Sequence, residues 1–252
     1  ILGYFFIGFY GTGFAWKKKI VIEFLSWAKF IIPSSIITLI LMQFDKIILG
    51  RILTASELGL YFIAFSVASA AKSFTVEYAR GVLQPYLSIV HRESPGQYIE
   101  MMYEKKQKIT LLIAFSLGVL SGSSFLFFDV LYDDRYLNAG FYLSLLLVTP
   151  IMTLVTYPSE VSLILYGQLK ATFTANVIRL AWFICGALGS YFWWGQNGLL
   201  LTIALVELCP AFYMMYQLKG YRAVKVSSEI SYVISAILGF ALAHFTIAIL
   251  GG

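Results

Sequence analysis

The sequence predicts an all-α fold, a polytopic bundle of membrane-spanning helices, and two observations indicate it. Of the 252 residues, 60% are hydrophobic and only 12% are charged, which is roughly half the charged fraction of a soluble domain. The apolar residues also come in long runs separated by short polar connections. A helix needs about 20 apolar residues to cross a bilayer, and these runs reach that length.

Seven runs are long enough to be complete spans. In order, they cover residues 22–52, 58–84, 108–132, 138–166, 170–194, 197–218 and 229–250. The longest connection, residues 85–107, contains apolar Tyr98, Ile99, Met102 and Tyr103 beside basic residues. This pattern indicates a short helix in the membrane interface, and a solvated loop is the alternative.

Lysine and arginine are distributed unequally between alternate connections. One set contains eleven of them, which are Lys17, Lys18, Lys19, Arg92, Lys105, Lys106, Lys108, Lys170, Lys219, Arg222 and Lys225. The other set contains two, Arg51 and Arg135, beside the acidic Glu57, Asp133 and Asp134. Because basic connections stay in the cytoplasm, the first set is expected to be cytoplasmic. The net charge of +5 is therefore interpreted as topology, not as a nucleic-acid-binding surface.

Three charged residues are expected near the middle of their spans. At about 1.5 Å per residue, Lys72, Arg179 and Glu207 lie about 14–20 Å from the nearer helix end. Charges at that depth face water or each other. A fixed lysine or arginine in a wet cavity can shield a phosphate group. The alternative is an internal ion pair of Glu207 with Lys72 or Arg179, which would only tie helices together.

Two further acids are candidates for coupling or gating. Glu160 lies about 10 Å from the inner end of its span. It is a candidate proton or cation site, or an acid hydrogen-bonded to Ser159 or Ser162. Asp45 follows an uncharged run and has only apolar residues three and four positions away. We expect Asp45 to face the bundle interior or the outer mouth of a cavity, and to pair across helices or with water.

No pattern indicates catalysis, a metal site or a cofactor. The two histidines are far apart, and the two cysteines lie inside apolar runs. We therefore expect a protein that is not an enzyme.

Three stretches resemble bacterial polysaccharide flippases of the multidrug/oligosaccharidyl-lipid/polysaccharide exporter superfamily. FDKIILGRILTASELGLYFIAF is similar to their seventh-to-eighth helix passage, and FFDVLYDDRYLNAGFYLSLL to the ninth-to-tenth. ANVIRLAWFICGALGSYFWWGQNGL is similar to the eleventh helix and the turn after it. The resemblance covers roughly residues 17–221. It implies two six-helix lobes around a central cavity. Residues 1–16 would then end the last helix of the first lobe, 17–226 would form the second lobe, and 227–252 would be an additional transmembrane helix.

The resemblance implies transport of an undecaprenyl-diphosphate-linked oligosaccharide across the bacterial inner membrane, for O-antigen, lipopolysaccharide or exopolysaccharide biosynthesis. Lys72 and Arg179 are then candidate diphosphate contacts, and Asp45, Glu160 and Glu207 are candidate coupling or gating residues. The implied partners are the lipid-linked oligosaccharide, the lipid bilayer, H+ or Na+, a polysaccharide polymerase and glycosyltransferases, but no nucleic acid.

Three rival functions remain open. A cation-coupled multidrug antiporter of the same superfamily predicts more acids than bases in the cavity, whereas the mid-depth set has two bases and one acid. A membrane polysaccharide polymerase or ligase needs a large loop outside the membrane, and the longest connection is short and cytoplasmic. The third alternative is a purely structural membrane scaffold.

Overall fold

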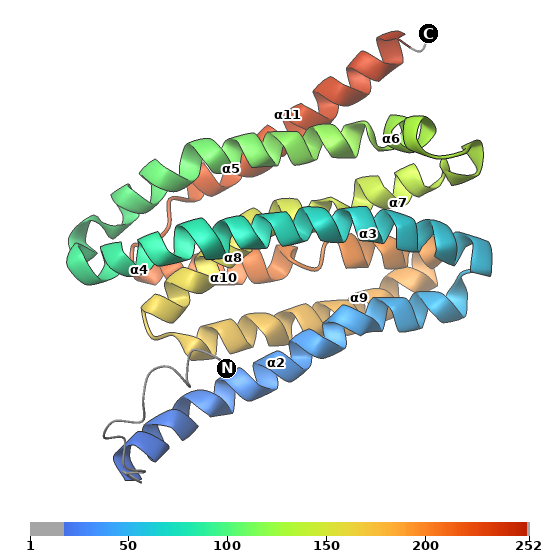
Figure 1. Ribbon diagram of the computed structural model, residues 1–252. Helices are drawn as coiled ribbons and strands as arrows, with labels where there is room; N and C mark the ends of the chain where they lie inside the picture. The colour runs from blue at the N-terminus through green and yellow to red at the C-terminus, as the bar shows by residue number, and fades with distance from the viewer. Residues whose placement is uncertain (1–17, 251–252) are drawn as a thin grey trace, which may run out of the picture.

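The computed structural model describes residues 18–250, which form helices and no strands (Figure 1). The α-helices are α2 (Lys18–Ile52), α3 (Ala55–Tyr78), α4 (Gln84–Glu93), α5 (Tyr98–Gly122), α6 (Ser124–Leu131), α7 (Ala139–Leu146), α8 (Val148–Leu165), α9 (Leu169–Ala204), α10 (Leu208–Gly220) and α11 (Val226–Leu250). The helix end expected at residues 1–16 lies outside the described residues. The predicted all-α polytopic bundle is confirmed.

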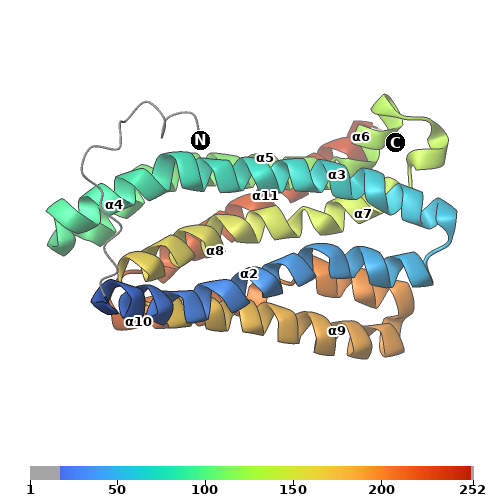
Figure 2. The ribbon, with the colours of Figure 1, turned by 60° about the horizontal axis from the view of Figure 1, so that its bottom comes forward.

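The long helices lie side by side along one common direction (Figures 1 and 2). Helix α2 packs on α9, α3 packs on α7 and α8, and α5 packs on α11. Among the described residues, five helical segments are long and apolar enough to cross a membrane, or six if the bent pair α5–α6 is one span. Many large apolar side chains on their outer faces are exposed, as expected for helices that contact lipid.

One of these segments, Leu169–Gly220, contains two of the predicted spans. Its 52 residues are too many for a single crossing. The chain turns back at Gly195, whose φ of 58° is accessible to glycine. The indole N–H of Trp182 donates to the carbonyl oxygen of Thr202, and Ser190 bonds to Thr202. The two predicted spans 170–194 and 197–218 are therefore the arms of a helical hairpin.

The prediction of an interfacial helix or loop at residues 85–107 is wrong. Residues 84–93 form α4, which continues α3 through the π-helical turn η1 (Ala79–Leu83). Residues 98–107 are the first turns of α5, so the connection is reduced to residues 94–97. The apolar face of this stretch packs inside the protein instead of against the membrane surface. The buried cluster is formed by Ala79, Leu83, Leu87, Val90, Tyr98, Met102, Tyr103 and Val161.

The span predicted at 108–132 begins earlier than expected. Helix α5 has 25 residues, which is about 37 Å of helix and longer than the hydrocarbon core of a bilayer. Helix α6 then departs at 65°. Lys105, Lys106 and Lys108 consequently lie within α5 and not in a connection. Lys106 is fully buried, so it does not contribute to the cytoplasmic surface charge from which the orientation was predicted.

The turn between α2 and α3 is fixed by a capping box. The hydroxyl of Thr54 accepts a hydrogen bond from the backbone N–H of Glu57, and the Glu57 carboxylate accepts one from the backbone N–H of Thr54. Each contact satisfies a donor that has no partner inside the helix. This turn holds the end of α2 beside the start of α3.

The orientation can be tested by thiol labelling of intact cells, in a background with Cys185→Ser and Cys209→Ser. We expect Asp133→Cys, in the exposed turn after α6, to react with an impermeant maleimide. Arg92→Cys, which is exposed in the last turn of α4, should react only after the membrane is permeabilised. The reverse labelling pattern would overturn the predicted orientation.

Candidate functional site

A cavity of about 760 Å³ lies between α2, α3, α7, α8 and α9. All five candidate residues predicted from the sequence line it, although they come from distant parts of the chain. These residues are Asp45, Lys72, Glu160, Arg179 and Glu207. The charged residues Lys46, Glu77 and Arg80 line the same cavity. No described residue of α5 or α11 does so.

An ion pair between Arg179 and Glu207 lies on one wall of the cavity. The guanidinium Nε and Nη2 atoms of Arg179 are each 2.9 Å from Oε2 of Glu207. Both side chains are largely buried, with 11% and 8% of their surfaces exposed. Arg179 also donates to the side-chain oxygen of Asn176, whose amide donates to Ser34 on α2. The polar contacts therefore form a chain from α2 through α9 to Glu207.

Glu207 is positioned by a break in the helical hairpin. It is the last of the three residues, 205–207, that separate α9 from α10, and it is the N-cap residue of α10. The break turns its carboxylate toward Arg179 and also toward the hydroxyl of Thr156 on α8, which donates to it. A carboxylate at this depth in a bilayer is stable only with such partners.

Of the two cations that contact Glu207, Lys72 has the weaker ion pair. Its Nζ atom is 3.8 Å from Oε1 of Glu207, and 44% of its side chain is exposed to the cavity and its mouth. By contrast, all three guanidinium nitrogens of Arg179 contact Glu207 or Asn176. The ion-pair alternative left open by the sequence is thus present in the structure, most strongly for Arg179. Of the two cations that contact Glu207, Lys72 is therefore the one that a ligand in the cavity can reach.

Glu160 lines the cavity at the inner part of α8. Among residues 18–250 it has no hydrogen-bond partner. Its predicted partners Ser159 and Ser162 donate to the backbone oxygens of Val155 and Pro158 instead. The carboxyl group of Glu160 therefore faces the cavity near the Arg179–Glu207 pair, and electrostatic interactions connect all three groups.

Asp45 lies where the sequence predicted, facing the bundle interior and paired across helices. It is buried, and its Oδ2 accepts a hydrogen bond of 2.8 Å from the hydroxyl of Tyr61 on α3. Its Oδ1 is buried without a hydrogen-bond partner of standard geometry. The ammonium of Lys46 lies 4.8 Å from the ring centre of Phe65, a favourable cation–π distance. Neither charge is simply solvated.

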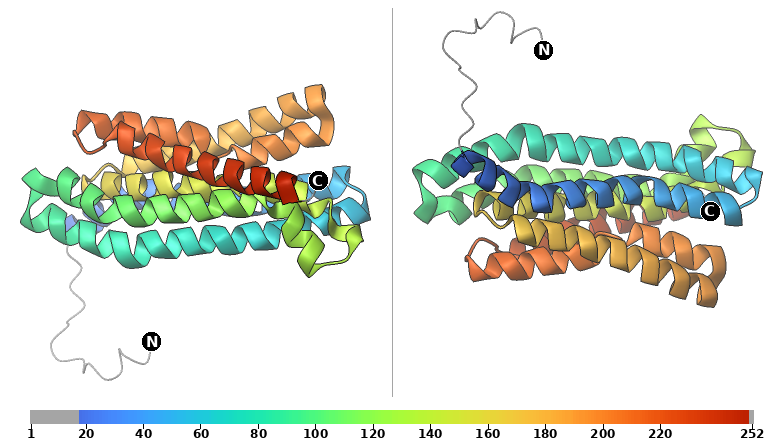
Figure 3. Two further views of the ribbon diagram at one scale, coloured as in Figure 1. Left: turned by 90° about the horizontal axis from the view of Figure 1, so that it is seen from above. Right: turned by 90° about the horizontal axis from the view of Figure 1, so that it is seen from below.

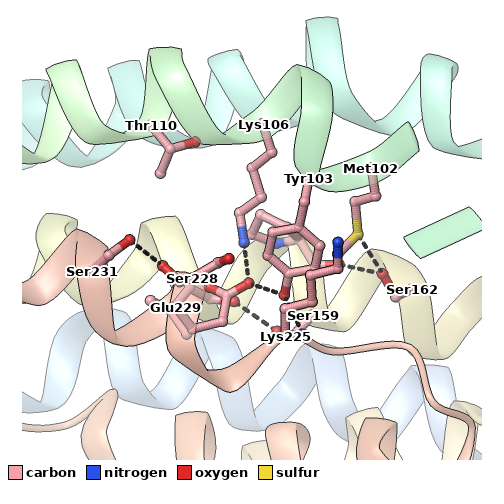
Figure 4. A network of polar contacts seen from close by, with 12 residues as sticks. Met102, Tyr103, Lys106, Thr110, Ser159, Ser162, Lys225, Ser228, Glu229 and Ser231 are labelled. Carbon is pink, nitrogen blue, oxygen red and sulfur yellow. Dashed lines mark hydrogen bonds and ion pairs between the residues drawn. The ribbon is translucent and has the colours of Figure 1, made fainter. Parts of the chain in front are cut away.

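A second buried ion pair, outside the cavity, was missed by sequence reasoning. Lys106 on α5 and Glu229 on α11 are 2.6 Å apart (Figure 4). The sequence placed Lys106 in a connection, so its burial was not considered. The four-residue spacing of Tyr98, Met102, Lys106 and Thr110 is the signal that could have found it, because it marks one helical face. Among the described residues no group of acids, histidines or cysteines is arranged to bind a metal ion.

Helices that span a membrane around a cavity lined by charged side chains define this chain as a multi-pass membrane protein. Residues 3–141, more than half of the chain, match the family model described as polysaccharide biosynthesis protein. The chain belongs to this family, which confirms the resemblance to flippase-type proteins and gives it a role in polysaccharide biosynthesis. Comparison with curated proteins and with solved structures gave no match.

The Arg179–Glu207 pair should be needed for stable folding. Arg179→Ala removes the closest cation from a largely buried carboxylate, and breaking a buried pair costs about 3–5 kcal/mol. We expect the amount of folded protein in the membrane to fall several-fold, with partial recovery in Arg179→Met/Glu207→Gln. Arg80→Ala, which breaks the exposed pair with Glu77, is the matched control and should be near neutral. A normal protein level in Arg179→Ala would show that the pair is dispensable for folding.

Proposed function

We propose that this protein is a transporter that moves an oligosaccharide carried on undecaprenyl diphosphate across the bacterial inner membrane. The product would serve the biosynthesis of a surface polysaccharide such as O-antigen. One observation carries the proposal. In a member of a polysaccharide biosynthesis family, a cavity between membrane-spanning helices contains a weakly paired cation, Lys72.

The chemistry of Lys72 suits the charged part of such a substrate. A diphosphate cannot cross the hydrocarbon core unless its charge is shielded. Lys72 can provide that shielding by exchanging its 3.8 Å contact with Glu207 for a phosphate oxygen. Glu207 would lose little, because Arg179 and Thr156 still bind it. Arg179 would then hold Glu207 in place instead of contacting the diphosphate directly.

Two cavity acids are the candidates for coupling transport to H+ or Na+. Glu160 has a carboxyl group without a hydrogen bond, close to the charges of Arg179 and Glu207. Asp45 has one buried oxygen without a partner. Protonation or cation binding at either site changes the charge balance of the cavity, and that change can favour one orientation of an alternating-access cycle.

A cation-coupled multidrug antiporter is the second candidate, because the cavity is electrically balanced. Its lining has four acids and four bases, so the excess of bases inferred from the mid-depth residues disappears. The acids are Asp45, Glu77, Glu160 and Glu207, and the bases are Lys46, Lys72, Arg80 and Arg179. The family description favours the polysaccharide substrate.

Transport is also favoured over a polymerase or ligase reaction. Such an enzyme would need reactive groups on an extended segment outside the membrane. Between residues 18 and 250 the connections are short, and the longest runs from Tyr132 to Asn138. We therefore propose that glycosyltransferases and a polymerase act before and after this protein as separate partners.

The role of Lys72 is tested by measuring surface polysaccharide per unit of protein in the membrane. A hydrogen bond to a charged group contributes about 1.5–3 kcal/mol, so Lys72→Gln should reduce export by about 10-fold or more. Lys72→Arg should retain most activity because the charge remains. Lys29→Gln is the control, since Lys29 is exposed on α2 and does not line the cavity. Normal export by Lys72→Gln would remove Lys72 from the substrate site.

A further inference from the structure

Helix α11 lies outside both the matched family region and the cavity. The family match ends at residue 141, whereas α11 covers Val226–Leu250. Figure 3 shows α11 alongside α5 on the opposite side of the bundle from α2. Sequence reasoning assigned no role to this additional helix, but its contacts are specific.

Glycines allow the backbones of α5 and α11 to touch. A side chain at Gly118 or Gly122 on α5 would collide with the backbone oxygens of Ala236 or Phe240 on α11. A side chain at Gly239 would in turn collide with the backbone of Phe115. Small residues at such contacts are typical of tightly packed membrane helices. The hydroxyl of Ser235 adds a hydrogen bond to a backbone oxygen of α5.

The buried ion pair between Lys106 and Glu229 lies at one end of this interface. The two side chains are 1% and 3% exposed. The hydroxyl of Tyr103 donates to the same carboxylate oxygen at 2.6 Å, and it accepts from the backbone N–H of Lys225 at 3.0 Å. The ammonium of Lys106 also lies 5.0 Å from the ring centre of Tyr232. Figure 4 shows the side chains of Lys106 and Tyr103 converging on Glu229.

We infer that the Lys106–Glu229 pair fixes the register of α11 on α5, so that the two helices form one rigid wall behind the cavity. A slip by one helical turn, about 5.4 Å, would separate the charges and bring side chains against the glycines. Buried charges specify register in other helical assemblies in the same way. Because neither helix lines the cavity, movements of a transport cycle occur between the other helices and leave this wall intact.

Charge substitutions test the register. Lys106→Met and Glu229→Leu should each lower the amount of folded protein in the membrane several-fold, because each leaves one buried charge unpaired. The charge-swapped double variant Lys106→Glu/Glu229→Lys should recover most of it, since the ion pair is restored in the same register. Arg80→Met, in an exposed pair, is the control. Normal levels in both single variants, or no recovery in the double variant, would overturn the inference. This readout does not depend on the transported substrate.

Cross-linking tests the rigid wall, in a background with Cys185→Ser and Cys209→Ser. Leu111→Cys/Ser235→Cys, joined by a short bifunctional thiol reagent, should leave export within about twofold of the unlinked protein. Loss of export on linking would overturn the inference, because it would show that α5 and α11 move relative to each other.

Discussion

The need to pair every buried charge inside a membrane is the constraint on which this structure depends. Glu207 shows it most clearly. Its carboxylate lies within the helical bundle and is bound by Arg179 from α9, by Thr156 from α8 and more loosely by Lys72 from α3. Because these partners come from three helices, satisfying one acid brings together the walls of the cavity. The apolar helix faces then pack in the arrangement that these polar contacts require.

The same constraint separates the cavity from the rest of the bundle. In the cavity, Lys72 is half exposed and its pairing is weak, so a ligand can compete for it. Between α5 and α11, Lys106 is fully enclosed and its pairing is short, so nothing can compete. Two lysine–glutamate contacts in one chain therefore differ in role because of exposure and distance. The first is suited to binding, and the second is suited to holding helices together.

The sequence predicted the features that depend on composition and on helix length. The spans follow from apolar runs, and the depths of Lys72, Arg179 and Glu207 follow from the helical rise. The prediction for residues 85–107 was wrong, because an apolar helix face has the same sequence pattern whether it contacts lipid or a neighbouring helix. Sequence reasoning also missed Lys106, whose partner Glu229 is 123 positions away. Likewise, local spacing showed that Asp45 lacks a partner on its own helix but could not identify Tyr61.

The candidate site combines two parts of the chain. Asp45 and Lys72 lie within the region that matches the polysaccharide biosynthesis family, whereas Glu160, Arg179 and Glu207 lie beyond it. Neither part alone forms the cavity. The side chains that pair with Glu207 come from both parts. Arg179, from the second part, neutralises Glu207, and Lys72, from the first part, is therefore free to bind a ligand.

The central claim is that Lys72 offers its charge to an anionic ligand in the cavity. The most direct measurement is equilibrium binding of a polyprenyl diphosphate to the purified protein in lipid nanodiscs, compared between the native protein and Lys72→Gln. We predict that the affinity falls by about 10-fold or more in the variant, while a neutral polyprenol binds both proteins equally. Equal affinity of the two proteins for the diphosphate would contradict the account.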